Sequence, residues 1–171
     1  MDVSEHIQEL IHILKREIQS FNAISELLIL EEKSLIEFDT KSLTDLIGRQ
    51  EDVFSSIACL EKSRQDVLVR IGEITGEDPK TMTVSQLSTM VDDPVRKKLI
   101  EAGHVLDSVY KDMKLKKSSN AMLIKQGVVL IENDIRTILK ALGKTHSDAS
   151  GYTSASRHNN ESGGICIDGR M

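Results

Sequence analysis

The fold is decided by residues 2–38, which read DVSEHIQELIHILKREIQSFNAISELLILEEKSLIEF. Large apolar side chains recur every seven residues along this stretch, which contains neither Pro nor Gly. The repeated positions are Ile7, Leu14, Phe21, Leu28 and Leu35. Such a long apolar row stays buried only when long helices pack against one another in near-coiled-coil geometry. We therefore predict one long helix here, with Asp2 as its N-cap and a capping box to Glu5.

A second long helix is predicted over about residues 42–74. Its apolar residues also recur every seven positions, at Leu46, Val53, Leu60, Val67 and Ile74. The short polar stretch at 38–42 separates the two helices, and a connection that short makes them antiparallel. Gly76 and Pro79 follow the second helix and end it, because Gly and Pro interrupt helical structure.

A third long helix is predicted over about residues 94–142, after a short helix at about 83–90. Pro94 is a favourable first helical residue. At ~100° per residue, one face that we expect to be buried carries Val95, Leu99, Ala102, Leu106, Val109, Met113, Ile124, Ile131, Ile135, Ile138 and Leu142. Polar Lys117 and Asn120 interrupt this face and predict a bend or fraying near residues 118–120. At ~1.5 Å per residue the helix is ~70 Å long against ~55 Å for the first, so its end should extend beyond the bundle.

The predicted fold is all-α: an elongated antiparallel three-helix bundle, coiled-coil-like, over residues 1–142, with a short helical insertion before the last helix. Residues 143–171 are rich in Ser, Gly, Asn and His and poor in large apolar side chains. Such a segment buries too little apolar surface to offset the entropy of ordering. We predict a flexible tail.

Composition excludes several classes of function. The net charge of -5 and pI near 5.6 argue against nucleic acid as the target, because phosphate binding depends on clustered Lys and Arg. The basic cluster of Lys111, Lys114, Lys116 and Lys117 is read as a solvated helix face.

No signal peptide or membrane span is recognised, so we expect a cytoplasmic protein that is not membrane-embedded. Cys59 and Cys166 are expected to be reduced.

One pattern invites a metal-site interpretation. Glu9 and His12, and likewise Glu101 and His104, have the Glu-x-x-His spacing of di-iron helical bundles. At ~100° per residue, however, both pairs lie at least ~120° from the apolar faces of their helices and should face water. His6 is also expected at the surface. We predict no metal, no cofactor and no enzymatic activity.

The last helix carries a second apolar group, which we call the lateral patch: Met122, Leu123, Val129 and Leu130. It lies nearly opposite the expected core face. A helix in a three-helix bundle needs only one buried stripe, so the lateral patch should be exposed and available to a partner. The alternative is that the short helix or a second copy of the chain covers it.

The chain resembles the FlgN family of flagellar export chaperones over almost its whole length. The resemblance rests on Leu27-Leu28-x-x-Glu31, Leu43-x-x-Leu46-x-x-x-Gln50-Glu51, Leu60-Glu61-x-x-Arg64, Asn120-x-x-Leu123-Ile124 and a polar tail with Thr153-Ser154-Ala155-Ser156. The order of these motifs along the chain, together with the tail, supports the resemblance.

The resemblance implies a cytoplasmic, non-catalytic protein. It would bind the C-terminal helical segments of the hook-filament junction proteins FlgK and FlgL, prevent their early assembly and deliver them to the type III export gate, including the FlhA cytoplasmic domain. It places client binding at the end of the last helix, on the lateral patch, and gate docking in the tail. The family often has Tyr four residues before a tail Gly, where this chain has Ser147 before Gly151 and Tyr152 after it. We expect a monomer or weak dimer; the alternative is a homo-oligomeric structural adaptor without an export role.

Overall fold

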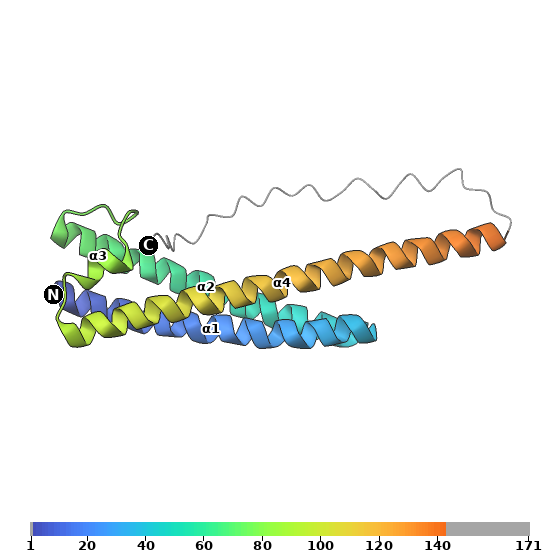
Figure 1. Cartoon of the computed structure of the whole chain (residues 1–171), viewed down its shortest axis with the longest axis horizontal. Coiled ribbons are helices and arrows are strands. Elements are labelled where there is room, and N and C mark those ends of the chain that lie inside the picture. Colours follow the sequence, from blue (N-terminus) through green and yellow to red (C-terminus); the bar gives the residue numbers. More distant parts are fainter. Residues whose placement is uncertain (1, 143–171) are drawn as a thin grey trace.

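A computed structural model describes residues 2–142, all of whose regular elements are helices. The long helices are α1 (Val3–Glu37), α2 (Thr40–Thr75) and α4 (Asp93–Ala141), and the short helix is α3 (Val84–Ser88). Helix α2 runs antiparallel to α1, and α4 returns in the direction of α1 (Figure 1). The structure confirms the predicted all-α, three-helix architecture with a short helical insertion before the last long helix.

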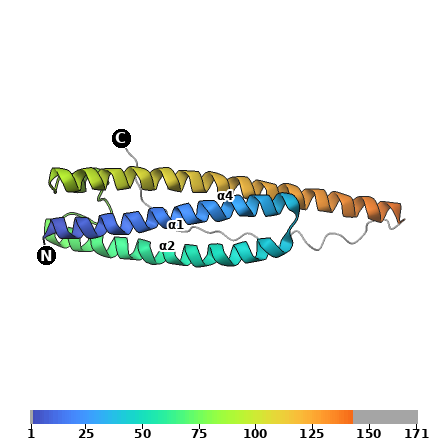
Figure 2. The ribbon, with the colours of Figure 1, turned by 90° about the horizontal axis from the view of Figure 1, so that it is seen from below.

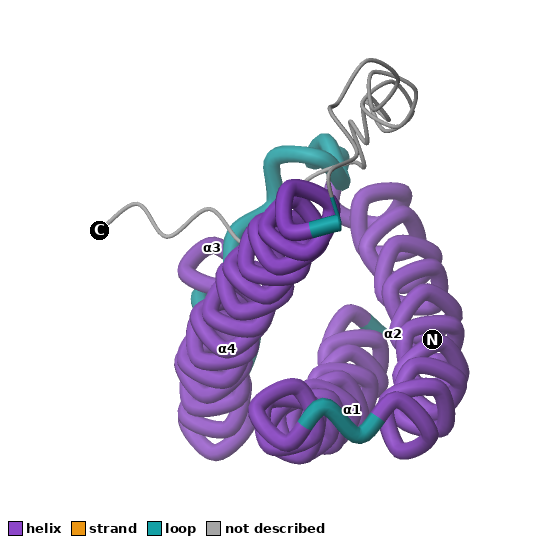
Figure 3. Tube along the Cα trace, turned by 90° about the vertical axis from the view of Figure 1, so that its right-hand side faces the viewer, coloured by secondary structure: helices purple, strands orange, loops and turns teal. Residues whose placement is uncertain are grey.

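Helix α1 is the middle member of the three. It packs along both α2 and α4, whereas α2 and α4 do not pair along their lengths. Figure 2 shows the resulting order, with α1 between the other two, and Figure 3 shows α2 and α4 on separate sides of α1. Because α1 meets a neighbour on two sides, it must bury an unusually broad face.

The sequence of α1 supplies that face. Four of its heptad residues, Ile7, Leu14, Phe21 and Leu28, are buried, and a second set lies beside them: Leu10, Ile11, Ile13, Ile24 and Leu27. The neighbouring helices contribute narrower rows, such as Val67 and Ile71 from α2 and Leu99 and Leu106 from α4. The core is thus a layer on either side of α1.

Buried polar contacts fix the axial register of α1 against α2 and α4. Between α1 and α2, Arg64 Nε donates to Glu17 Oε1 at 3.1 Å, and both residues are buried. Burial raises the pKa of the Glu17 carboxyl, while the Arg64 charge opposes that rise. Between α1 and α4, the buried Asn120 amide donates to the Leu28 carbonyl at 2.8 Å and to Glu31 Oε2 at 2.7 Å. Buried polar pairs of this kind select one register over its neighbours.

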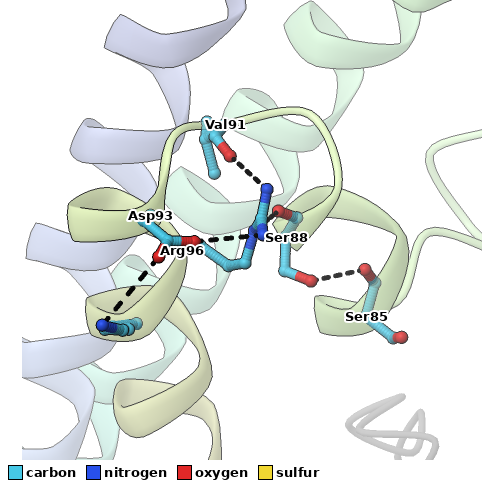
Figure 4. A network of polar contacts seen from close by, with 6 residues as sticks. Ser85, Ser88, Val91, Asp93 and Arg96 are labelled. Carbon is cyan, nitrogen blue, oxygen red and sulfur yellow. Dashed lines mark hydrogen bonds and ion pairs between the residues drawn. The ribbon is translucent and has the colours of Figure 1, made fainter.

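Helix α3 closes the end of the bundle where α4 begins. Thr83 and Gln86 form a reciprocal capping box, which satisfies the first backbone N–H groups of α3. Arg96 holds the following turn, because Nε donates to the Ser88 carbonyl at 2.9 Å and Nη2 donates to the Val91 carbonyl at 3.1 Å (Figure 4). Gly103 lets Val84 approach α4, since an added Cβ would lie 3.2 Å from that side chain.

Several local predictions differ from the structure. Asp2 is the N-cap of α1, but its side chain makes no cap hydrogen bond, so the capping box to Glu5 is absent. Ile74 is half-exposed because α2 is about to end there. Helix α4 is continuous through residues 118–120, since the two hydrogen bonds of Asn120 compensate the interruption of its apolar face. His6 is buried rather than at the surface.

Replacing Asn120 with Ala should lower the free energy of unfolding by about 1–3 kcal/mol, because the buried Glu31 carboxylate and the Leu28 carbonyl would each lose a donor. Urea denaturation followed by circular dichroism measures the loss. Asn133→Ala is the matched control, since Asn133 is exposed on the same helix, and it should leave the midpoint unchanged. Equal midpoints for the two variants would show that Asn120 contributes nothing to stability.

Replacing Arg64 with Leu should destabilise the fold by about 3 kcal/mol at pH 8, because Glu17 would be left buried without its cation. The pKa of Glu17 would rise further in the folded chain than in the unfolded chain, so the folded state would bind the proton more tightly. The stability of the variant should therefore fall as the pH rises from 5 to 8.

Unfolding midpoints at both pH values provide the measurement. The double variant Glu17→Met/Arg64→Leu should recover most of the loss and show less pH dependence, because no buried charge remains. A single variant whose loss is the same at both pH values would contradict this account of Glu17.

Candidate functional site

The final 22 described residues include the end of α4, and its last part projects beyond the bundle. After Asn120, no residue of α4 up to Leu142 is buried. Helix α1 has 35 residues and α4 has 49, so at ~1.5 Å per residue α4 is longer by ~21 Å. Figure 1 shows α4 continuing past the end of the α1–α2 hairpin. The excess corresponds to about the last 14 residues of α4; we call residues 121–142, which also include the stretch beside the end of α1, the projecting segment.

Apolar residues at alternating spacings of four and three line one side of the projecting segment. This heptad face consists of Ile124, Val128, Ile131, Ile135, Ile138 and Leu142. Their side chains are 47–66% exposed. The prediction that Ile124, Ile131, Ile135, Ile138 and Leu142 belong to the core is therefore wrong. They do continue the buried face of α4, but past Glu37, where α1 ends, no other described element covers that face. Ile124 follows Asn120 by four residues and lies beside the last turns of α1, and it is still 47% exposed.

The lateral patch also lies on the projecting segment. Met122, Val129 and Leu130 are 48–62% exposed, whereas Leu123 is half-buried. None of the four is sealed within the interior. The structure thus places two apolar surfaces on one helix, where the sequence interpretation expected only the lateral patch to be free.

One edge of the α1–α4 interface adds exposed apolar residues that the sequence interpretation missed. Ser25 Oγ donates to Asp112 Oδ2 at 3.3 Å and marks this edge. Ile29 and Ile36 follow Ser25 by 4 and 11 residues, so they lie on the same side of α1, and they are exposed. Leu123 follows Asp112 by 11 residues and lies on the same side of α4. The spacing of residues within each helix does not show that Ile29 and Ile36 lie near Leu123. That requires the register of α1 against α4, which the sequence does not give.

Charged side chains flank the heptad face. At ~100° per residue, Glu132 and Asp134 lie ~80° to either side of its centre, and Lys125 lies nearer the bundle. The segment 121–142 contains no other Asp or Glu. Glu132 and Asp134 are therefore the charged residues nearest the middle of the heptad face, whereas Lys125 and Arg136 lie ~100–120° from its centre on the side of Glu132.

The basic cluster before this segment is largely paired within the chain. Lys111 Nζ lies 2.6 Å from Asp107 Oδ2, and Lys116 pairs with Asp112. The hydrogen bond from Lys116 holds the pKa of the Asp112 carboxyl below its usual range. Lys117 Nζ lies 5.3 Å from the centre of the Phe54 ring on α2. These local contacts account for three of the four lysines.

The two Glu-x-x-His pairs, Glu9 with His12 and Glu101 with His104, do not come together in the structure. Glu9 Oε1 accepts a hydrogen bond from Arg70 Nη2 at 2.8 Å, which lowers the pKa of the Glu9 carboxyl. His12, Glu101 and His104 are exposed. Within residues 2–142, no three His, Cys, Asp or Glu side chains gather in a way that could hold a metal ion.

The fold defines an elongated all-helical protein whose last described helix exposes apolar surface on residues 121–142. Residues 1–160 match the family model for the FlgN protein. The chain therefore belongs to the FlgN family, and its general role is that of a flagellar export chaperone. FlgN is a chaperone family rather than an enzyme family.

No curated protein and no solved structure matches the chain. None of the helices in residues 2–142 combines the length and apolar character needed to cross a membrane. The suggested gate-docking residues Ser147, Gly151 and Tyr152 lie outside the described residues.

Backbone amides of residues 125–138 should exchange with solvent faster than those of residues 99–113 on the same helix. The inner part of α4 opens only with the bundle, whereas no described element packs on most of the projecting segment, which should open locally. Hydrogen–deuterium exchange with peptide resolution measures both parts in one experiment. Equal protection along α4 would show that something covers the projecting segment in the free protein.

Proposed function

We propose that the chain binds the C-terminal helical segments of the hook-filament junction proteins FlgK and FlgL through its projecting segment. Membership of the FlgN family supports a flagellar client in general terms. The single observation that carries the proposal is the exposure of both apolar surfaces on residues 121–142. Contiguous exposed apolar surface of this kind marks a binding site in a soluble helical protein.

The mechanism is masking. A client helix that would pack against other subunits in a filament lays its apolar side on the projecting segment instead. The heptad face spans residues 124–142, or ~27 Å of helix at ~1.5 Å per residue. A helix-in-groove contact that buries ~800 Å² per partner is enough for a specific complex. The client then cannot assemble early, because the surface it needs is occupied.

Delivery to the export gate is assigned to residues 143–171, which begin directly after the heptad face. In this proposal Ser147, Gly151 and Tyr152 contact the cytoplasmic domain of FlhA while the client stays on α4. The arrangement separates the two tasks along the chain. It requires the protein to act in the cytoplasm, on the side of the gate from which clients enter.

A homo-oligomeric structural adaptor is the second candidate. The same heptad face could pair with another copy of the chain, since coiled-coil partners are often identical. The mass of the free protein distinguishes the two candidates. A stable dimer that added client does not dissociate favours the adaptor, whereas a monomer that forms a complex with client favours the chaperone.

Replacing Leu130 and Ile131 together with Glu should abolish co-elution with the C-terminal segments of FlgK and FlgL. One substitution places a carboxylate on the lateral patch and the other places one on the heptad face, so both surfaces lose their apolar character. Helix content should stay the same, because both side chains are exposed in the free chain. Size-exclusion chromatography and circular dichroism provide the two readouts.

The matched control is Val69→Glu/Ile74→Glu, which changes two comparably exposed apolar residues on α2 and should retain co-elution. Retained binding by the Leu130/Ile131 variant would remove the projecting segment from consideration. Native mass spectrometry of the chain without residues 143–171 extends the test. Client binding should persist in this shorter chain, and binding to the FlhA cytoplasmic domain should be lost.

A further inference from the structure

The two apolar surfaces of the projecting segment differ in length and spacing. The heptad face has six members whose spacings alternate between four and three residues. That pattern is the signature of a helix that packs against one other helix with a left-handed twist. The lateral patch has four members within nine residues, and Gln126, Asn133 and Thr137 prevent it from extending along the helix. Only the heptad face offers a full-length seat for a helix.

Most of the space beside the heptad face lies beyond the end of α1, since only six residues of α1 follow Glu31, the partner of Asn120. Residues Leu106, Met113 and Asn120 on the same side of α4 are buried, and Asn120 bonds to Leu28 and Glu31 of α1. Past Glu37 no described residue covers that side. A helix bound there would continue the course of α1 along α4.

A second copy of the chain fits this seat poorly. In a parallel pair, the partner's α4 would run into the space that α1 already fills. In an antiparallel pair with full overlap, Ile131 faces Ile135 of the other copy and Val128 faces Ile138. Glu132 then faces Glu132, and Asp134 faces Asp134, so like charges meet on both flanks. A shift of one heptad separates these charges but leaves Ile124 and Val128 of each copy uncovered.

We propose that the heptad face accepts a single client helix whose apolar residues repeat with the same spacing and whose flanks carry Lys or Arg opposite Glu132 and Asp134. The acidic pair has two effects in this arrangement. It opposes self-association of the free chaperone, and it selects clients with basic flanks. Flanking charges determine partner choice in coiled coils in the same way. The inference rests on the proposed client binding and assigns it to one face.

Titration of the C-terminal segments of FlgK and FlgL, each tested separately, locates the binding face. Ile131→Glu/Ile138→Glu should abolish binding, whereas Leu123→Glu/Leu130→Glu should retain it, because the second pair lies ~100–120° from the centre of the heptad face. All four positions are outside the core, so the folded bundle is preserved in both variants. The opposite result would overturn the inference and leave the proposed function intact.

Charge reversal tests the flanks. Glu132→Lys/Asp134→Lys should weaken client binding about five-fold at low salt, and the difference should shrink at 0.5 M salt as screening increases. Asp66→Lys/Glu73→Lys is the matched control, because it changes the net charge equally at exposed positions on α2. Equal affinities for the two variants would overturn the role of the acidic pair.

Native mass spectrometry of the wild-type chain alone completes the test, with a monomer as the expected species. A dimer that Ile131→Glu/Ile138→Glu dissociates would identify a second copy as the occupant and overturn the inference. If the wild-type chain binds neither client segment, the proposed function itself falls. In contrast, if only the assignment to the heptad face or to the acidic pair is wrong, the wild-type chain still binds the client segments.

Discussion

The packing of α4 on α1 is the constraint on which the rest of the structure depends. Among the helices of residues 2–142, α1 is the long helix that packs along α4, because α2 lies on another side of α1. The apolar face of α4 is therefore buried only as far as α1 extends. Met113 and Ile131 are both large apolar residues on this face, but Met113 is buried and Ile131 is exposed. They differ because α1 packs on α4 at Met113 and has ended before Ile131. Burial in this fold is set by helix length as much as by residue type.

Register determines how much of α4 remains uncovered. Apolar rows with a seven-residue repeat can slide by one heptad at modest cost, since similar side chains meet again. Buried polar groups remove that freedom. Asn120 must meet Leu28 and Glu31, and Arg64 must meet Glu17, so a slid helix would leave buried groups without partners. These contacts hold the end of α1 at a fixed level on α4 and thereby fix the extent of the heptad face.

The sequence predicts the elements well and the surfaces less well. Heptad spacing at Ile7 to Leu35 is a local property, so the long helices and their order follow from it directly. The exposure of Ile131 and Ile135 is not local, because it depends on where a helix more than eighty residues away ends. The role of Asn120 is also non-local: its sequence position interrupts an apolar face, but in the fold it forms hydrogen bonds to α1. Likewise, the neighbours of Ile29 and Ile36 on α4 follow only from the register of the two helices.

The connection between α1 and α2 consists of Phe38 and Asp39, with Phe38 in the left-handed region at φ 56°. Because only two residues connect α1 to α2, the two helices cannot shift along each other at this end. Any change in the length of one helix must be matched in the other, and insertions at this hairpin tip are tolerated only as equal additions to both arms. Relatives with longer arms would expose less apolar surface at an unchanged length of α4. The extent of the exposed heptad face thus depends on residues far from it in the sequence.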